Sequence, residues 1–173
     1  PQELAALFRN LHRLAHMQKK RVISLSISGE KPDFFDEHFQ KLNEQTRWKY
    51  QFVGEITPEN VEAQLKDHRL LICGGSESTN IFPELYSLAW GIPVLSSSQL
   101  EWRDYLNSPQ VTYFAPLSTE DLSDKIALMI KDENTWLKQS QLGEEFIQRN
   151  YILEHYPRRI LSHLMRMFQM KVG

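Results

Sequence analysis

Short apolar runs alternate with longer segments of helical periodicity along this chain, and this alternation limits the fold more than any other feature. The runs have the length of strands, and each is nearly continuous in apolar or β-branched residues. They cover residues 22–27, 50–53, 70–73, 92–95 and 111–114. Strands of this kind are typical of parallel sheets covered by helices on both faces. The sequence therefore predicts an α/β fold with a Rossmann-like, doubly wound parallel sheet.

The stretches between these runs carry helix signals. Residues 2–17 place apolar side chains at helical spacing. Thr57 can cap a helix whose first position is Pro58, and Ser118 caps another predicted helix that runs to about residue 132. Further helices are predicted over residues 33–46, 81–90, 134–149 and 155–170. No internal boundary interrupts the pattern, so we expect residues 1–173 to form one domain.

Composition excludes several classes of protein. The 173 residues are 41% hydrophobic and 24% charged, which is unlike a disordered tail. The formal net charge of −2 offers no general attraction for nucleic acid or an anionic membrane. The single cysteine, Cys73, can form neither an internal disulfide nor a cysteine-based zinc site. No apolar run reaches the roughly 20 residues of a membrane span, and no signal peptide is visible, so we expect a cytoplasmic protein. No histidines or paired carboxylates have the spacing of metal ligands, so we expect no metal site.

The turns after the predicted strands are the places to look for a ligand, because open parallel sheets bind ligands beyond the carboxyl ends of their strands. One turn contains Gly29, a second runs from Gly54 to Ile56, and the third follows residues 70–73. In the third turn, two glycines precede a series of hydroxyl and amide side chains at a helix start, a pattern that favours an anion such as phosphate. The alternative is an ordinary tight turn followed by a helix cap. The turn has neither P-loop nor dinucleotide-binding spacing.

The stretch from Leu70 to Leu95 resembles a known family. It reads as a strand, a Gly-Gly-Ser-Glu-Ser-Thr-Asn loop, a helix that ends in Ala-Trp-Gly-Ile-Pro-Val, and a further strand. This order is similar to the C-terminal domain of GT-B glycosyltransferases of family 4, the "glycosyl transferases group 1" type. The segments 52–56 and 118–131 are similar to further landmarks of that family. The resemblance implies half of a two-lobed enzyme that binds a nucleotide-sugar donor, needs no other cofactor, and works with an N-terminal lobe that this segment lacks.

The resemblance also implies roles for individual residues. Glu77 would be the catalytic residue and would accept hydrogen bonds from the donor sugar. The turn after residues 50–53 would lie against the nucleotide base, and the loop after residues 70–73 would meet the diphosphate and sugar. The donor-binding set is Gly29, Gly54, Glu55, Ile56, Gly75, Ser76, Ser78, Thr79, Asn80 and Glu84.

Glu84 departs from the family pattern. The family places seven residues between its two carboxylates, whereas six separate Glu77 from Glu84. Counted back from Gly91, the second glutamate of the family falls at Tyr86. Glu84 either reaches the ribose through a local shift or is a solvated glutamate in the first turn of a helix, where a negative charge is favourable.

Three functions fit this sequence. The leading hypothesis is the donor-binding domain of a glycosyltransferase that transfers a sugar to an acceptor. The second is a glycosyltransferase-like subunit that no longer catalyses and instead binds proteins within a glycosylation or export complex. The third is a sugar-nucleotide epimerase of the same architecture.

The histidines, His68 among them, are expected to be surface or packing residues rather than ligands. The predicted helix 155–170 carries a wide apolar face, so we expect it to pack on another lobe or to form a dimer.

Overall fold

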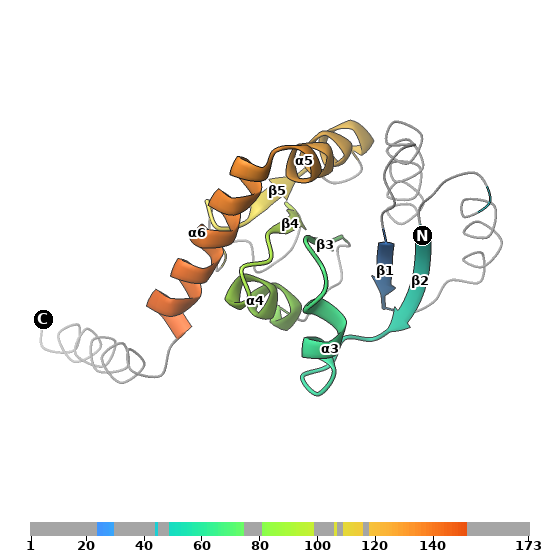
Figure 1. The fold of residues 1–173 in the computed structure, drawn as a ribbon, viewed down its shortest axis with the longest axis horizontal. Helices are drawn as coiled ribbons and strands as arrows, with labels where there is room; N and C mark the ends of the chain where they lie inside the picture. Colours follow the sequence, from blue (N-terminus) through green and yellow to red (C-terminus); the bar gives the residue numbers. More distant parts are fainter. Residues whose placement is uncertain are drawn as a thin grey trace, which may run out of the picture.

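The computed structural model describes residues 24–29, 44, 49–74, 81–98, 106, 109–115 and 118–151. Strands and helices alternate through this part of the chain (Figure 1). In chain order the elements are β1 (Ser24–Ser28), β2 (Lys49–Gly54), α3 (Val61–Leu65), β3 (Leu71–Cys73), α4 (Phe82–Ala89), β4 (Val94–Ser97), β5 (Thr112–Phe114), α5 (Thr119–Lys131) and α6 (Glu133–Tyr151). Three predicted helices lie outside these residues, or almost entirely so: 2–17, 33–46 and 155–170. The dimer surface expected on helix 155–170 lies outside them as well.

The described strands pair only in parallel, which confirms the α/β prediction. One sheet contains β1 and β2, and the other has the order β3-β4-β5. In the second sheet, Cys73 lies opposite Ser96 and Leu95 lies opposite Thr112. The residues of β4 are all buried, as expected for the central strand of a covered parallel sheet.

The sequence predicts one sheet, whereas the described strands fall into two. No backbone ladder joins β1 to β3 among these residues. Side chains make the connection instead: the His68 ring, three residues before β3, shares a 2.8 Å hydrogen bond with the Ser26 hydroxyl on β1. Apolar content predicts that a segment is a strand, but it does not predict which strand lies beside it.

Most boundaries differ from the prediction by one or two residues, and two of the differences have a visible physical cause. The strand expected over residues 92–95 begins at Val94, because Gly91 has a φ of 64° and Pro93 has no N–H to donate. Thr57 does not cap α3, which begins at Val61. The Thr57 N–H donates to Asn60 Oδ1 at 2.8 Å, and the Thr57 carbonyl accepts from the Asn60 and Val61 N–H groups, so a turn over residues 58–60 leads into the helix.

Ser118 caps α5 as predicted. Its hydroxyl accepts from the Asp121 N–H at 3.3 Å. The Asp121 carboxylate accepts from Lys125 Nζ and from the Ala115 N–H, each at 2.7 Å, and these bonds hold the pKa of Asp121 below its ordinary value. Lys125 Nζ also donates to the Tyr113 carbonyl. The first turn of α5 is therefore tied to the end of β5.

One core cluster of the described residues lies between the three-stranded sheet and the helices α4 and α6. Its buried members are Leu88, Val94, Leu106 and Val111, and Phe146 and Ile147 of α6 pack against them. The close approach of α6 to α4 depends on Gly143, because a Cβ there would come within 2.8 Å of Leu88 Cδ2. At its other end, α6 is tied to the chain before β3 by the Trp136 indole, which donates to the Arg69 carbonyl at 2.7 Å.

A second glycine, Gly91, controls the turn between α4 and β4. Its φ of 64° lies in the left-handed region, and a Cβ would come within 2.6 Å of Ser140 Oγ and against the Glu144 carboxylate of α6. We predict that Gly91→Ala lowers the free energy of unfolding by about 2–5 kcal/mol. A left-handed alanine costs about 1–2 kcal/mol, and displacing packed neighbours costs about 1–3 kcal/mol.

The matched control is Gly54→Ala, measured beside it by urea unfolding. Gly54 has a φ of 75°, but nothing lies within 4 Å of its missing Cβ. This variant should show only the conformational cost of about 1–2 kcal/mol. Equal losses for the two variants would contradict the packing argument.

Candidate functional site

The turns at the carboxyl ends of β1 and β2 lie together. The Gly29 N–H donates to the Gly54 carbonyl at 3.1 Å, so two of the predicted site residues are joined directly. The turn continues with Glu55, which is exposed, and its carbonyl accepts from the Asn60 side chain at 3.0 Å. These bonds give the Gly54–Ile56 turn a defined backbone conformation on the surface of the domain.

Ile56 and Tyr86 pack against the same apolar cluster. This cluster consists of Val61 and Leu65 of α3 with Ile92 after α4. The turn after β2 and the middle of α4 therefore border one region of the molecule, although they lie far apart in the sequence. Tyr86 is the position at which the family resemblance places the second glutamate.

The loop after β3 carries most of the predicted ligands, and it lies outside the described residues. This applies to Gly75, Ser76, Glu77, Ser78, Thr79 and Asn80. The residues that border the loop are described. Gly74 is exposed, and α4 begins after Ile81, whose side chain provides no cap for the helix. The roles assigned to the loop residues remain predictions.

Glu84 is buried, so the expectation of a solvated glutamate is wrong. Glu84 is 1% exposed, although it belongs to the first turn of an eight-residue helix. The reason is the rotation of α4: Glu84, Ser87 and Leu88 form its buried face. Tyr86 lies about 200° around the helix from Glu84, on the side that packs against α3. Glu84 as a ribose ligand remains a prediction, but the carboxylate presents almost no surface to solvent.

The Cys73 thiol lies beside the Glu84 carboxylate. Burial raises the pKa of Cys73 well above its ordinary value, and the charge of Glu84 and the hydrogen bond between the two side chains raise it further. The thiol is therefore protonated at neutral pH and donates to the carboxylate. This contact joins the last residue of β3 to the first turn of α4. Composition alone describes Cys73 only as a lone cysteine, and no pattern in the sequence indicates its partner.

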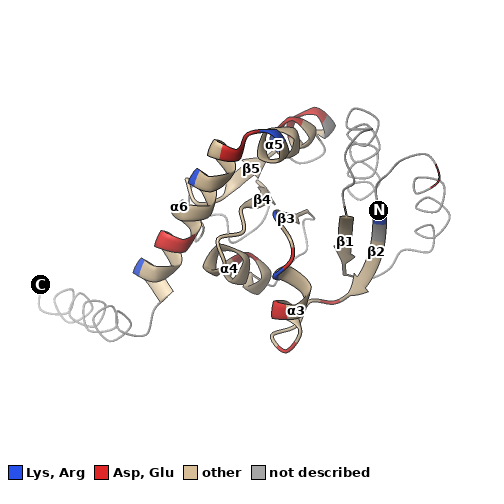
Figure 2. Ribbon diagram, in the orientation of Figure 1, with Lys and Arg blue, Asp and Glu red and all other residues tan. Residues whose placement is uncertain are grey.

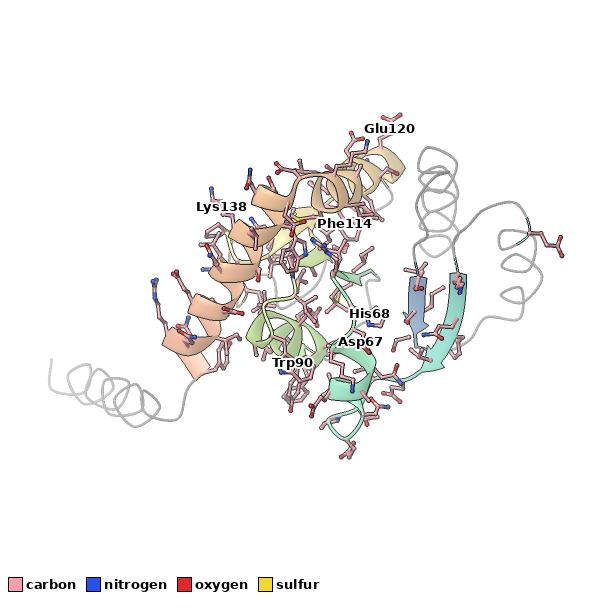
Figure 3. All side chains as sticks on the ribbon, viewed as in Figure 1. Asp67, His68, Trp90, Phe114, Glu120 and Lys138 are labelled. Atoms are coloured by element: carbon pink, nitrogen blue, oxygen red, sulfur yellow. The ribbon has the colours of Figure 1, made fainter. Side chains whose placement is uncertain are left out.

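His68 makes a polar contact that the sequence did not indicate. Its Nε2 and the Gln51 side chain both bond to Ser26 Oγ, at 2.8 and 2.9 Å. Its Nδ1 is buried and has no partner among the described residues. Figure 3 places His68 next to Asp67, between α3 and β3. His68 is half-buried, and the expectation that it packs rather than binds a ligand remains a prediction.

Charge and hydropathy complete the picture of the described surface. Acidic and basic segments alternate along α5 and α6, so these helices form no continuous basic surface (Figure 2). In the ranges that the structure describes, no group of three His, Cys, Asp or Glu residues could hold a metal ion. Within the same ranges, no helix has both the length and the apolar character needed to cross a membrane.

The chain matches no protein-family model and no curated protein sequence. Its structure does match solved ones. The catalytic domain of cholesterol-α-glucosyltransferase from Helicobacter pylori superposes with a TM-score of 0.64 at 17% identity, over 83% of this chain and 87% of that one. The C-terminal domain of a glycosyl transferase group 1 family protein (LpcC) from Francisella tularensis superposes with a TM-score of 0.51 at 16% identity. This match covers 82% of our chain and 93% of that domain.

A longer protein has the same fold in part. Anabaena Alr3699/HepE, solved in complex with UDP and glucose, matches with a TM-score of 0.65 at 12% identity. The match covers 93% of this chain but 44% of Alr3699/HepE, so the chain spans less than half of that protein. Together these likenesses confirm the GT-B fold that the sequence resemblance implies. At such low identity they show the fold alone.

We predict that Cys73 reacts slowly with iodoacetamide in the folded protein. The thiolate is the nucleophile, and the raised pKa of Cys73 keeps its population low. Alkylation at pH 8 should be at least about tenfold slower than in urea-unfolded protein, since each unit of pKa changes the thiolate fraction about tenfold at pH values below the pKa. Mass spectrometry over time measures both rates. Equal rates in the two states would contradict a shielded thiol.

Proposed function

We propose that this chain is the donor-binding domain of a glycosyltransferase, and that it binds a nucleoside diphosphate sugar. The observation that carries the proposal is the structural match with Alr3699/HepE, whose solved complex contains UDP and glucose. Two features of this chain support it. The turn after β2 and the connection from β3 to α4 both lie at carboxyl ends of parallel strands, where open α/β sheets bind ligands.

Each part of the donor has a proposed neighbour. The base lies against the Gly54–Ile56 turn, where the backbone and the half-buried Ile56 offer polar and apolar contacts. The diphosphate lies at the start of α4, because a helix N-terminus presents unpaired N–H groups and a positive dipole end. Ser76, Ser78, Thr79 and Asn80 add hydroxyl and amide groups, and Gly75 allows a close approach of the backbone.

The proposed reaction moves the sugar from the diphosphate to an acceptor. As the bond breaks, negative charge grows on the leaving diphosphate, and preorganised N–H groups at the start of α4 stabilise it. Glu77 accepts hydrogen bonds from hydroxyl groups of the sugar and so orients it. No metal or further cofactor is part of this proposal. The acceptor and any general base belong to the second lobe of a two-lobed enzyme.

Donor binding is tested by isothermal titration calorimetry with UDP, GDP and ADP. We predict that one of the three binds with a Kd of about 1 mM or tighter, equivalent to about −4 kcal/mol. The matching nucleoside should bind much more weakly, because it lacks the diphosphate that the helix N-terminus attracts. Absence of binding by all three diphosphates would contradict the proposal.

That negative outcome would favour the second function, a non-catalytic subunit that binds proteins. One observation favours it now: Tyr86 occupies the place of the second glutamate of the family, and the nearby Glu84 is buried. A tyrosine hydroxyl cannot replace both oxygens of a carboxylate.

A mutation tests the role of Glu77. We predict that Glu77→Gln, in the complete polypeptide, lowers the rate of sugar transfer about 10- to 150-fold. This is the effect of losing a charged hydrogen bond of about 1.5–3 kcal/mol. Glu55→Gln is the control and should change the rate much less, because we expect the base to be bound mainly by backbone and apolar contacts.

Thermal melting of both variants beside the wild type checks that they fold. Unchanged transfer by a well-folded Glu77→Gln protein would remove Glu77 from the site. It would also favour the non-catalytic alternative.

A further inference from the structure

A side-chain hydrogen bond joins the two sheets of the described structure. Among the described residues, the two-stranded sheet (β1, β2) and the three-stranded sheet (β3, β4, β5) share no backbone ladder. His68 Nε2, on the connection from α3 to β3, lies 2.8 Å from the Ser26 hydroxyl in the middle of β1. Figure 3 shows His68 on the side of that connection that faces β1.

The chain around His68 is tied to the helices of the three-stranded sheet. The His68 N–H donates to the Leu65 carbonyl at the end of α3, at 2.9 Å. The Arg69 carbonyl accepts from the Trp136 indole of α6 at 2.7 Å, and the Arg69 guanidinium lies 4.6 Å from the centre of that ring. Arg69 also forms an ion pair of 2.8 Å with Glu133. The imidazole of His68 is therefore presented to β1 from a part of the chain that both α3 and α6 hold.

Ser26 is held in the same way within the two-stranded sheet. It lies opposite Gln51 in the β1–β2 ladder, and the Gln51 side chain donates to the Ser26 hydroxyl at 2.9 Å. A hydroxyl has two lone pairs and one proton, so it can accept from Gln51 and still bond to His68. The same oxygen thus takes part in one bond within its sheet and one bond to the other sheet.

The second ring nitrogen of His68 shows that this side chain does more than fill space. His68 Nδ1 is buried and has no partner among the described residues. A buried polar atom without a partner lowers the stability of the fold. An apolar side chain that only packs would avoid that cost. The bond from Nε2 to Ser26 is therefore the feature that distinguishes a histidine from an apolar residue at this position.

The two sheets carry different parts of the proposed donor site. Gly29, three residues after Ser26, donates to the carbonyl of Gly54, which begins the turn proposed for the base. Gly74, six residues after His68, begins the loop proposed for the diphosphate. The covalent structure of a nucleotide fixes the distance between its base and its diphosphate. Both parts of the site can therefore bind one nucleotide only when the two sheets have a matching separation.

We propose that His68 is a positioning residue: its hydrogen bond to Ser26 sets the separation between the Gly54–Ile56 turn and the loop after β3. His68 does not touch the nucleotide, because it precedes the amino end of β3, whereas the loop follows the carboxyl end. The effect on nucleotide affinity rests on the proposed function. The bond itself and its effect on the two sheets do not, so they are tested separately.

A double-mutant cycle tests the bond without any nucleotide. Urea unfolding of Ser26→Ala, His68→Ala and the double variant should show non-additive losses. We expect a coupling of about tenfold in the unfolding equilibrium constant, equivalent to about 1.4 kcal/mol and within the usual range for one hydrogen bond. The matched control cycle pairs Gln51→Ala with His68→Ala and should show a much smaller coupling, because the bond of Gln51 lies within one sheet. Additive losses for Ser26 and His68 would overturn the proposal.

Residual dipolar couplings measured by NMR test whether the bond keeps the two sheets in one orientation. In the wild type, the amides of both sheets should fit a single alignment tensor. In Ser26→Ala and His68→Ala, the amides of β1 and β2 should depart from the tensor that fits β3, β4 and β5. His68→Gln keeps a polar side-chain amide for Ser26 and should restore the single tensor. A single tensor in both alanine variants would contradict the positioning role.

Nucleotide binding by the same variants tests the consequence for the proposed site. For whichever of UDP, GDP and ADP binds the wild type, Ser26→Ala and His68→Ala should raise the Kd about 3- to 10-fold in calorimetry, up to the full coupling of the bond. His68→Gln and Gln51→Ala should change it less than about twofold. The matching nucleoside and inorganic pyrophosphate, followed separately by amide chemical shifts, should bind these variants as they bind the wild type, since each contacts one sheet only.

The pattern across these ligands separates positioning from a general loss of structure. Equal weakening of nucleotide, nucleoside and pyrophosphate would overturn the positioning role, because that role affects only a ligand that spans both sheets. Unchanged nucleotide affinity in Ser26→Ala and His68→Ala would overturn it as well. If the wild type binds none of the three diphosphates, the proposed function fails. The mutant cycle and the dipolar couplings then still confirm or refute that the Ser26–His68 bond positions the two sheets.

Discussion

The close packing of α6 on α4 is the contact on which the rest of the described structure depends. Leu88 is completely buried, and it lies directly against Gly143 of α6, where any side chain would collide with it. Ser140 and Glu144 of α6 lie over Gly91 in the same way. These two glycines let the helix approach the turn between α4 and β4, and this approach sets the rotation of α4. The rotation in turn directs Glu84 into the interior and Tyr86 toward α3.

This arrangement places three polar side chains at one end of a covered parallel sheet. Cys73, Glu84 and Ser96 all lie near the carboxyl ends of β3 and β4. A buried polar group is costly unless it is hydrogen-bonded, so a fold retains such groups where they specify a particular arrangement or serve a ligand. Here they lie at the carboxyl end of β3 and the start of α4, where our proposal places the diphosphate of a nucleotide sugar. The polar interior and the proposed ligand therefore meet at the start of α4.

The sequence allowed the fold class and most elements to be predicted, because these depend on local patterns. Apolar runs of four to six residues became β1 to β5, and helical periodicity with the cap at Ser118 became α5. The prediction was weaker where several local signals compete. Thr57 and Pro58 are typical of a helix start, yet residues 58–60 form a turn and the helix begins at Val61. Likewise, the strand at Val94 begins late because a glycine and a proline precede it.

By itself, the sequence determined which segments are strands and helices, where the glycine turns occur, and which family the stretch from Leu70 to Leu95 resembles. Each of these features depends on residues that are close together in the sequence. Only the tertiary structure decided that the described strands form two sheets, that Ser26 meets His68, and that Glu84 is buried against Cys73. The helix dipole favours a glutamate in the first turn of a helix whether the side chain is exposed or buried, so the sequence position does not reveal its environment. Its environment is set by the face that α4 turns toward the sheet, and that face depends on the packing of α6, which begins about fifty residues later in the chain.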